Sequence, residues 1–268
     1  MTWDCMALTF GFGLLLGSFV NVLIHRLPRM IMATSTTEMT SQRYDLCWPA
    51  SHCPHCQTPL KARHNIPVLS YCWLRGRCGF CQHPISWQYP LIEISTAVIW
   101  LGSVGLWGFD SVGFCWAAVG TVLLALSVID WQTTLLPDTL TQTLVWGGLI
   151  ASSLGWAALP LTQAVWGAAL GYLSLWSVAS VFERITGKQG MGAGDFKLLA
   201  GLGAWLGPLG LLPVVLLASF SGAGVGLFLQ WTHRLRSDGY VPFGPFLATA
   251  GAVVAVIGID RMGLWMGW

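Results

Sequence analysis

Long apolar runs recur along the chain and alternate with short polar segments. Most runs approach the roughly 20 residues that an α-helix needs to cross a bilayer. They fall at 6–24, 90–108, 113–130, 140–158, 163–182, 197–211, 213–232 and 244–264. The sixth and seventh share one apolar stretch, which we divide at Gly207-Pro208 and at Pro213 because glycine and proline break helices. The pattern therefore predicts an all-α polytopic membrane protein with about eight transmembrane helices.

The composition agrees with this class. Of the 268 residues, 54% are hydrophobic and only 9% are charged, which excludes an ordinary soluble domain. A net charge of +2 is too small to favour nucleic acid as a partner, so the expected surroundings are membrane lipid. The first apolar run lacks a small-residue cleavage site before the basic segment HRLPR, and we expect it to be retained as the first helix.

Basic residues set the expected orientation. With eight spans and a periplasmic N-terminus, twelve of the thirteen Lys and Arg residues fall on the cytoplasmic side, and only Arg261 does not. The twelve are Arg26, Arg29, Arg43, Lys61, Arg63, Arg75, Arg77, Arg184, Lys188, Lys197, Arg234 and Arg236. This asymmetry follows the positive-inside rule. The long polar segment 28–88 is then cytoplasmic, between a first transmembrane helix (1–27) and the remaining helices (89–268).

Two Cys-x-x-Cys pairs lie in this segment, 21 residues apart. Thiolates at this spacing can share one tetrahedral Zn²⁺ ion, and a cytoplasmic location disfavours the alternative of disulfides. The expected ligands are Cys53, Cys56, Cys78 and Cys81. The neighbouring His52, His55 and His83 could substitute as ligands. A site closed by four protein ligands is structural, so we assign no catalytic role to the zinc ion in this zinc-ribbon-like insertion.

Two of the eleven carboxylates stand out because ionisable groups in membrane spans usually serve a function. Asp130 ends the third expected span, and Asp195 begins the sixth. Both would lie at the cytoplasmic face of the membrane. Two carboxylates in one site can share a proton, so that one activates a water molecule while the other polarises a peptide carbonyl. The pair is therefore a candidate catalytic centre for aspartic proteolysis.

Small residues and one lysine surround Asp195 in the segment GMGAGDFK. Gly192 and Gly194 would let a substrate backbone approach closely, and Lys197 could hold a substrate carboxylate or tune the aspartate. The simpler alternative is that Asp195 only stabilises a helix N-terminus and that Asp138 caps the fourth span. A proton-relay transporter also uses membrane carboxylates, although it would need a hydrated path across the bilayer.

Several long motifs, in order and over nearly the whole chain, resemble the type IV prepilin peptidase and N-methyltransferase family. These motifs are GSFVNVLIHRLP (17–28), the cysteine segment from CPHC to ISWQYPLIE (53–93), IDWQTTLLPD (129–138), GMGAGDFKLLAGLGAWLG (190–207) and VPFGPFLATAG (241–251). The resemblance implies a bacterial inner-membrane aspartic protease of the glycine-aspartate type. Such an enzyme removes the leader of type IV prepilins or type II secretion pseudopilins after a glycine and then methylates the new N-terminus with S-adenosylmethionine. Asp130 and Asp195 match the catalytic pair of the family, which makes 89–268 the peptidase core.

The resemblance implies a methyl donor, but segment 28–88 contains no glycine-rich nucleotide-binding unit. We expect the donor near NIPVLSY and LRGRC, with Arg75 or Arg77 meeting its carboxylate and Glu93 holding its ribose. The alternative for these basic residues is contact with anionic lipid. Gln88 departs from the family, which typically has an arginine before YPL. Two other hypotheses remain at this point: a peptidase whose insertion only positions substrate, and a non-catalytic zinc-ribbon membrane assembly module.

Overall fold

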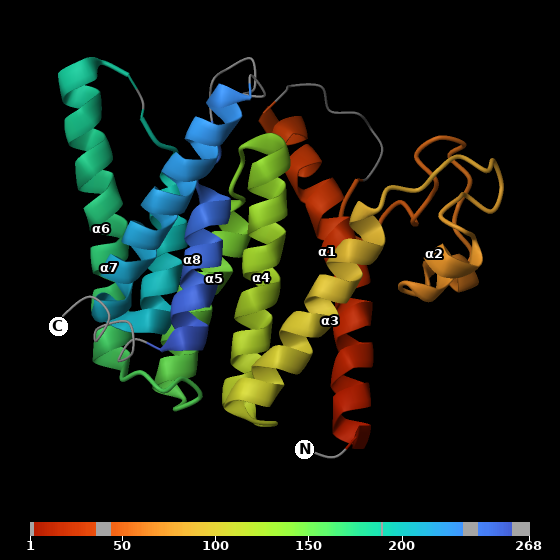
Figure 1. Ribbon diagram of the computed structural model, residues 1–268, viewed down its shortest axis with the longest axis horizontal. Coiled ribbons are helices and arrows are strands. Elements are labelled where there is room, and N and C mark those ends of the chain that lie inside the picture. Colours follow the sequence, from red (N-terminus) through yellow and green to blue (C-terminus); the bar gives the residue numbers. More distant parts are fainter. Residues whose placement is uncertain (1–2, 36–43, 189, 233–240, 259–268) are drawn as a thin grey trace. The chain divides into compact units, whose positions relative to one another are not determined.

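The computed structural model describes residues 3–35, 44–188, 190–232 and 241–258. Its long helices are α1 (Trp3–Ser35), α3 (Gln88–Trp107), α4 (Ser111–Thr133), α5 (Asp138–Ser153), α6 (Leu161–Thr186), α7 (Ala193–Trp231) and α8 (Gly244–Ile257) (Figure 1). Between α1 and α3, the described part of the insertion contains a 3-10 turn (Ala62–Asn65), a short helix α2 (Leu69–Trp73) and two isolated β-bridges. The expected all-α fold with an insertion after the first helix is confirmed.

The chain divides into two compact units within α4: residues 1–121 and residues 122–268. The helix α3 therefore belongs with α1 and the insertion, whereas the sequence grouped it with the helices that follow. Helix α1 also continues through Pro28 to Ser35, beyond the expected end at residue 27. A proline inside a helix removes one backbone hydrogen bond, which kinks a helix more often than it ends a long one.

In the first unit, α1 and α3 cross at two glycines four residues apart. A Cβ on Gly13 would lie 2.6 Å from the Cα of Ala97, and a Cβ on Gly17 would lie 2.5 Å from the Cα of Glu93. These paired contacts make the two helices antiparallel and bring their backbones together at a small-xxx-small contact, as membrane helices commonly do. The crossing fixes Glu93 against α1.

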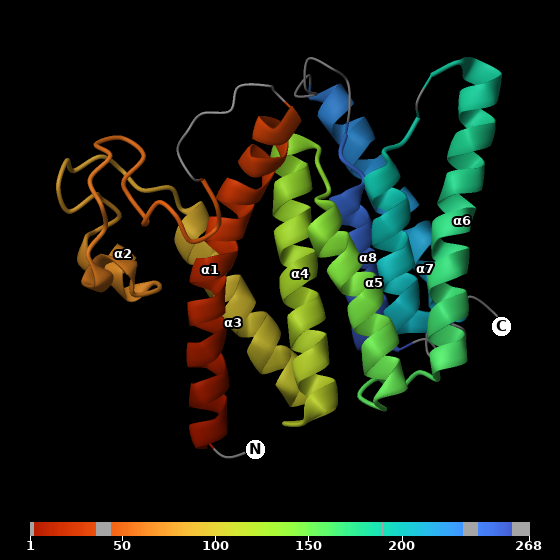
Figure 2. The same cartoon turned by 180° about the vertical axis from the view of Figure 1, so that it is seen from behind.

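In the second unit, the first part of α7 is the central helix. Nearly every residue from Asp195 to Gly207 is buried, and the indole Nε1 of Trp205 donates a hydrogen bond to the carbonyl of Leu144 at 2.9 Å. Helix α6 packs directly against it: a Cβ on Gly167 would overlap the backbone of Gly203. Figures 1 and 2 show α6 and α7 side by side.

Helix α7 is two helices joined at Gly207, where the backbone has φ 70° and ψ 179°. Only glycine adopts this conformation readily. Before this point α7 runs away from the start of α5, because Gly201 contacts Leu144 and Gly148 contacts Ala204. After it the chain returns, since a Cβ on Gly222 would meet Phe246 and one on Gly226 would meet Val241, just before α8. The expected division of this stretch at Gly207-Pro208 is confirmed.

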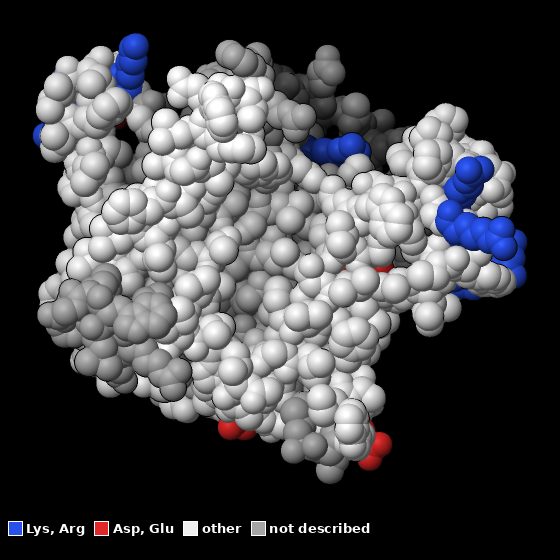
Figure 3. All heavy atoms as spheres, in the orientation of Figure 1, with Lys and Arg blue, Asp and Glu red and all other residues white. Residues whose placement is uncertain are grey.

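Five helices in the described part of the chain are long and apolar enough to cross a membrane: α1, α3, α4, α6 and α7. Helix α5 has 16 residues and α8 has 14. In Figure 3 the helix surfaces are largely free of charge, and basic side chains gather over the insertion and at the end of α6. The expected end of the last span (259–264), together with Arg43, Arg234, Arg236 and Arg261, lies outside the described residues.

Candidate functional site

Asp130 and Asp195 lie close enough together in the second unit for their charges to interact. Their side chains are only 4% and 3% exposed. Asp130 is in the last turn of α4, which ends where Thr134 adopts a left-handed φ of 55°. Asp195 is in the first turn of α7, after Gly192 as N-cap. Two carboxylates from helices 60 residues apart in the chain therefore share one buried environment.

The backbone of Gly244 contacts Asp130 directly. Its N–H donates a hydrogen bond to Oδ2 of Asp130 at 3.0 Å, in a buried position. Gly244 is the first residue of α8, so this N–H is one of the helix-terminal donors that have no partner within the helix. The positive end of the helix dipole and a hydrogen bond both favour a carboxylate at this position. A side chain here is excluded, because a Cβ on Gly244 would lie 2.6 Å from the same oxygen.

Asp195 has a different environment. Its Oδ1 is buried and has no hydrogen-bond partner in the described part of the chain. The preceding residue, Gly194, packs on Leu136, where a Cβ would come within 2.6 Å of the leucine Cβ. Leu136 also faces Gly244. Leu136 thus lies between the backbone that carries Asp195 and the start of α8 that contacts Asp130, and Oδ1 of Asp195 is left without a donor among the described residues.

Lys197 pairs with Asp138 across the same end of the unit. Its Nζ lies 2.7 Å from each carboxylate oxygen of Asp138, and the side chains are 25% and 66% exposed. Asp138 is in the first turn of α5 and does not cap that helix with its side chain, because Pro137 is the N-cap. The ion pair therefore joins the start of α5 to the start of α7, next to Asp195.

The four predicted cysteine ligands come together in the first unit. Their sulfur atoms all lie within 4.8 Å of one another, and Cys53 and Cys81 are 3.9 Å apart. In a tetrahedral site with Zn–S bonds of about 2.3 Å, ligand sulfurs are about 3.8 Å apart. The donor set and its spacing fit Zn²⁺. The neighbouring histidines are engaged elsewhere: His52 contacts the carbonyl of Ala50, and His55 stacks on His83.

Two equivalent turns build this cluster. In each turn, the amide four residues after the first cysteine donates a hydrogen bond to the carbonyl of that cysteine: Gln57 N–H to Cys53 and Gln82 N–H to Cys78. Both glutamines have a left-handed φ, of 57° and 59°. Hydrogen bonds from the side chain and backbone of Thr58 lower the pKa of Cys56 to about 6. This favours the thiolate, which is the form that binds metals.

A cavity in the first unit is lined by Glu93 and by Asn65, Ser70 and Tyr71 of the NIPVLSY segment, as expected for a methyl-donor site; Arg75 and Arg77 do not line it. A carboxylate oxygen of Glu93 accepts the N–H of Val68 at 2.7 Å. Val68 has φ 58° and ψ −47°, and the next N–H bonds to the Pro67 carbonyl, which makes a strained γ-turn. Glu93 thus anchors the NIPVLSY segment to α3.

Three contacts of these sites are not evident from the sequence motifs alone. They are the hydrogen bond from Gly244 to Asp130, the Lys197–Asp138 ion pair, and the hydrogen bond between Glu93 and the γ-turn at Val68. Each joins residues that are distant in the chain. The sequence offered two weak signals. One was Gly244 before a proline at the start of an apolar run, and the other was an acid, Asp138, and a base, Lys197, near the starts of two helices. Sequence spacing does not show which partner such residues meet.

Two family models match the chain. Residues 12–107 match the bacterial peptidase A24 N-terminal domain, and residues 117–227 match the type IV leader peptidase family. A prepilin leader peptidase/N-methyltransferase of Burkholderia pseudomallei (strain K96243) is 44% identical over 265 residues, covering 94% of this chain and 85% of that protein. Proteins of the same name from Dickeya chrysanthemi and Aeromonas hydrophila are 44% and 46% identical, covering 94% and 99% of this chain and 92% and 94% of their own lengths. No solved structure matches the chain.

Proposed function

Because this chain belongs to the type IV leader peptidase family, we propose that it is a bifunctional enzyme of the bacterial inner membrane. It cleaves the leader from type IV prepilins or type II secretion pseudopilins after a glycine and then methylates the new N-terminal amine. Residues 122–268 contain the peptidase site, and the first unit serves methyl transfer. The observation that carries the peptidase is the buried pair Asp130 and Asp195.

The two aspartates have different roles in hydrolysis. Asp130, which accepts the Gly244 N–H, is the carboxylate that takes a proton from the attacking water. Asp195, whose Oδ1 needs a donor or a proton, is the acid that polarises the scissile carbonyl. Water adds to the carbonyl carbon, and the tetrahedral intermediate collapses as the proton held by Asp130 moves to the leaving amine. No covalent intermediate and no metal takes part in this sequence.

Methylation uses S-adenosylmethionine. The neutral N-terminal amine attacks the methyl carbon, the carbon–sulfur bond breaks with its electron pair on sulfur, and the amine proton leaves to water. The products are the N-methylated peptide and S-adenosylhomocysteine. One structural Zn²⁺ ion held by Cys53, Cys56, Cys78 and Cys81 keeps the insertion folded. The N-terminus is periplasmic and residues 28–88 are cytoplasmic, which the basic residues of the insertion support.

The test is cleavage of a purified prepilin by the wild type and by Asp130→Asn and Asp195→Asn in lipid nanodiscs with S-adenosylmethionine present. We expect both folded variants to lose at least 10³-fold in cleavage rate, because each removes one half of the acid–base pair. Mass spectrometry of the wild-type product is expected to show one added methyl at its N-terminus. Cleavage retained by both variants would reject the aspartate mechanism. An unmethylated wild-type product would leave a peptidase whose insertion only positions substrate.

A further inference from the structure

A cavity of about 430 Å³ lies within the first unit, apart from the aspartate pair. Its walls come from α1, from the start of α3, from the NIPVLSY segment with α2, and from the two cysteine turns. Cavities that bind small molecules in proteins usually measure about 300–1,000 Å³. The cavity is therefore large enough for a nucleoside with an amino-acid arm, and nothing in the peptidase mechanism uses it.

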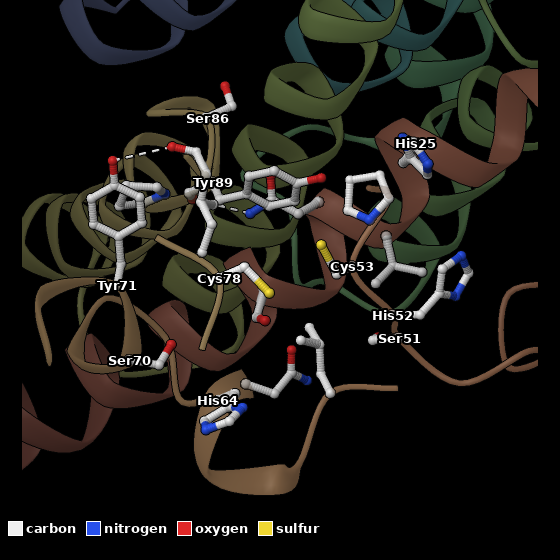
Figure 4. A pocket seen from close by; sticks show the side chains of 18 of the residues that line it. His25, Ser51, His52, Cys53, His64, Ser70, Tyr71, Cys78, Ser86 and Tyr89 are labelled. Carbon is white, nitrogen blue, oxygen red and sulfur yellow. Dashed lines mark hydrogen bonds between the residues drawn. The ribbon is translucent and has the colours of Figure 1, made fainter. Parts of the chain in front are cut away.

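The two sides of this cavity differ in chemistry. Figure 4 shows His25 and His52 on one side and Tyr71, Ser70 and His64 on the other, with Tyr89 between them. The first side also carries Arg29. The second side offers the flat faces of an aromatic and an imidazole ring, and the Nδ1 of His64 is buried without a hydrogen-bond partner in the described residues. One side thus suits an anionic group, and the other suits a planar base.

Asn21 supplies an open hydrogen-bond acceptor on the α1 wall. Its side chain is 94% buried, being only 6% exposed. Its Nδ2 donates to the carbonyls of Tyr89 at 3.1 Å and Gly17 at 3.3 Å. These bonds fix the orientation of the amide, and they leave Oδ1 buried with no partner among the described residues. Leaving a buried amide oxygen without a donor is unfavourable, so Asn21 favours a ligand that presents an N–H group here.

Asn21, His25 and Arg29 form one row on α1 because they are four residues apart. Residues at this spacing lie about 6 Å from one another on the same helix face. The row begins with an acceptor for N–H groups, continues with an imidazole that can donate a hydrogen bond, and ends with the positively charged guanidinium of Arg29. Arg26 lies on the adjoining part of the wall, but its guanidinium already donates hydrogen bonds to the carbonyls of Asp45 and Pro49, at 2.9 Å and 2.6 Å. We therefore assign it no ligand contact.

We propose that this cavity binds the methyl donor, with the amino-acid arm along the α1 row and the adenosine between Tyr71 and His64. The α-ammonium donates to Asn21 Oδ1, and the α-carboxylate meets His25 and Arg29. This proposal rests on the methyltransferase half of the proposed function. A lipid phosphate would fit the basic side, but a lipid headgroup has no planar base for the aromatic side. This site replaces the expected one at Arg75 and Arg77. In it, Glu93 anchors the NIPVLSY segment, which forms one wall of the cavity.

Two ligands are used to test the two ends of the cavity separately. S-adenosylhomocysteine contains the adenosine and the amino-acid arm, whereas 5′-methylthioadenosine lacks the arm. Binding of each is measured by calorimetry to the full-length protein in nanodiscs, for the wild type, Asn21→Leu, Asn21→Asp and Arg29→Gln. The control is Thr9→Val, which also removes a buried polar group from α1 but lies about 18 Å along the helix from Asn21. Prepilin cleavage is measured on every sample.

We expect Asn21→Leu to weaken S-adenosylhomocysteine binding on the order of tenfold or more, and Arg29→Gln several-fold. Asn21→Asp keeps an acceptor oxygen but loses the hydrogen bonds that Nδ2 donates to Tyr89 and Gly17, so it is expected to weaken binding less than Asn21→Leu does. Binding of 5′-methylthioadenosine and prepilin cleavage are expected to be unchanged in all four variants. This pattern separates a lost ligand contact from a damaged fold.

Other results would overturn the proposal. Equal weakening of both ligands by Asn21→Leu would mean that Asn21 contacts the base, and the orientation would be wrong. If Asn21→Leu and Arg29→Gln bind S-adenosylhomocysteine as the wild type does, and the wild type methylates its product, the methyl donor binds elsewhere. The proposed function would then stand, and the proposed binding site would be wrong. A wild type that cleaves but neither binds S-adenosylhomocysteine nor methylates would reject the methyltransferase itself.

Discussion

Replacing Gly244 with alanine tests whether its close approach to Asp130 matters for catalysis. The new Cβ would lie 2.6 Å from Oδ2 of Asp130 and 3.2 Å from Cδ2 of Leu136. A carbon and an oxygen in ordinary contact are about 3.3 Å apart, so the carboxylate or the start of α8 must move by about 0.7 Å. Because Leu136 also crowds the added Cβ, the new methyl group cannot avoid the carboxylate by shifting toward Leu136.

This displacement has two costs for the reaction. It lengthens the hydrogen bond from the Gly244 N–H, and a hydrogen bond to a charged group contributes about 1.5–3 kcal/mol. It also shifts one of two groups that must be positioned together, and a misplacement of about 1 Å can reduce a rate about 10²-fold. Since these effects overlap, we expect Gly244→Ala to lower kcat for prepilin cleavage by about 10–100-fold.

The assay compares kcat and KM for a purified prepilin in nanodiscs. Gly226→Ala is the matched control, because it adds a Cβ near the same entry to α8, where the nearest atom is 4.0 Å away in Val241. The control is expected to cleave at the wild-type rate. A Gly244→Ala enzyme with wild-type kcat would refute the reasoning. An equal loss in the control would show that any added methyl group in this region disturbs the enzyme.

Two further predictions concern the ion pair and the metal. Lys197→Met or Asp138→Asn is expected to change the free energy of unfolding by under about 1 kcal/mol in thermal unfolding, because the ion pair is partly exposed. The rate of prepilin cleavage is expected to fall several-fold in each single variant and to recover in part in the charge-exchanged double variant. An inactive double variant would point to a direct role of Lys197 in substrate binding. Cys56→Ser is expected to lower bound zinc, measured by elemental mass spectrometry, from about one ion per chain, whereas Cys72→Ser outside the cluster leaves it unchanged; full zinc in Cys56→Ser would exclude the four-cysteine site.

Local patterns were predictable from the sequence, and long-range contacts were not. The cysteine cluster follows from two turns whose geometry depends on neighbouring residues, so the spacing alone predicted which four cysteines come together. The break at Gly207 was likewise local, because glycine and proline limit the backbone wherever they occur. By contrast, the end of α1 was placed too early, at residue 27, whereas the helix continues through Pro28 to Ser35.

The partners of charged and polar groups depend on how helices pack, which periodicity does not specify. Lys197 was expected to act on substrate or on Asp195, but its Nζ bonds to Asp138, whose side chain was itself expected to cap α5. Asn21 was hidden within an apolar run and has one side-chain oxygen without a partner in the described residues. Such residues are recognised only when the neighbouring helices are in place.

The glycines around Asp195 show why residue type does not determine role. Gly194 was expected to admit a substrate backbone, yet its free side faces Leu136, where a Cβ would lie at 2.6 Å. It is therefore required by packing within the protein. Gly192 is exposed, and a Cβ on it would have no atom within 4 Å. An open glycine at the N-terminus of a helix, three residues before a buried carboxylate with a free oxygen, is the position at which an extended peptide can approach. Of these two glycines, only Gly192 has open space beside it, so we propose that substrate approaches at Gly192, whereas Gly194 packs on Leu136.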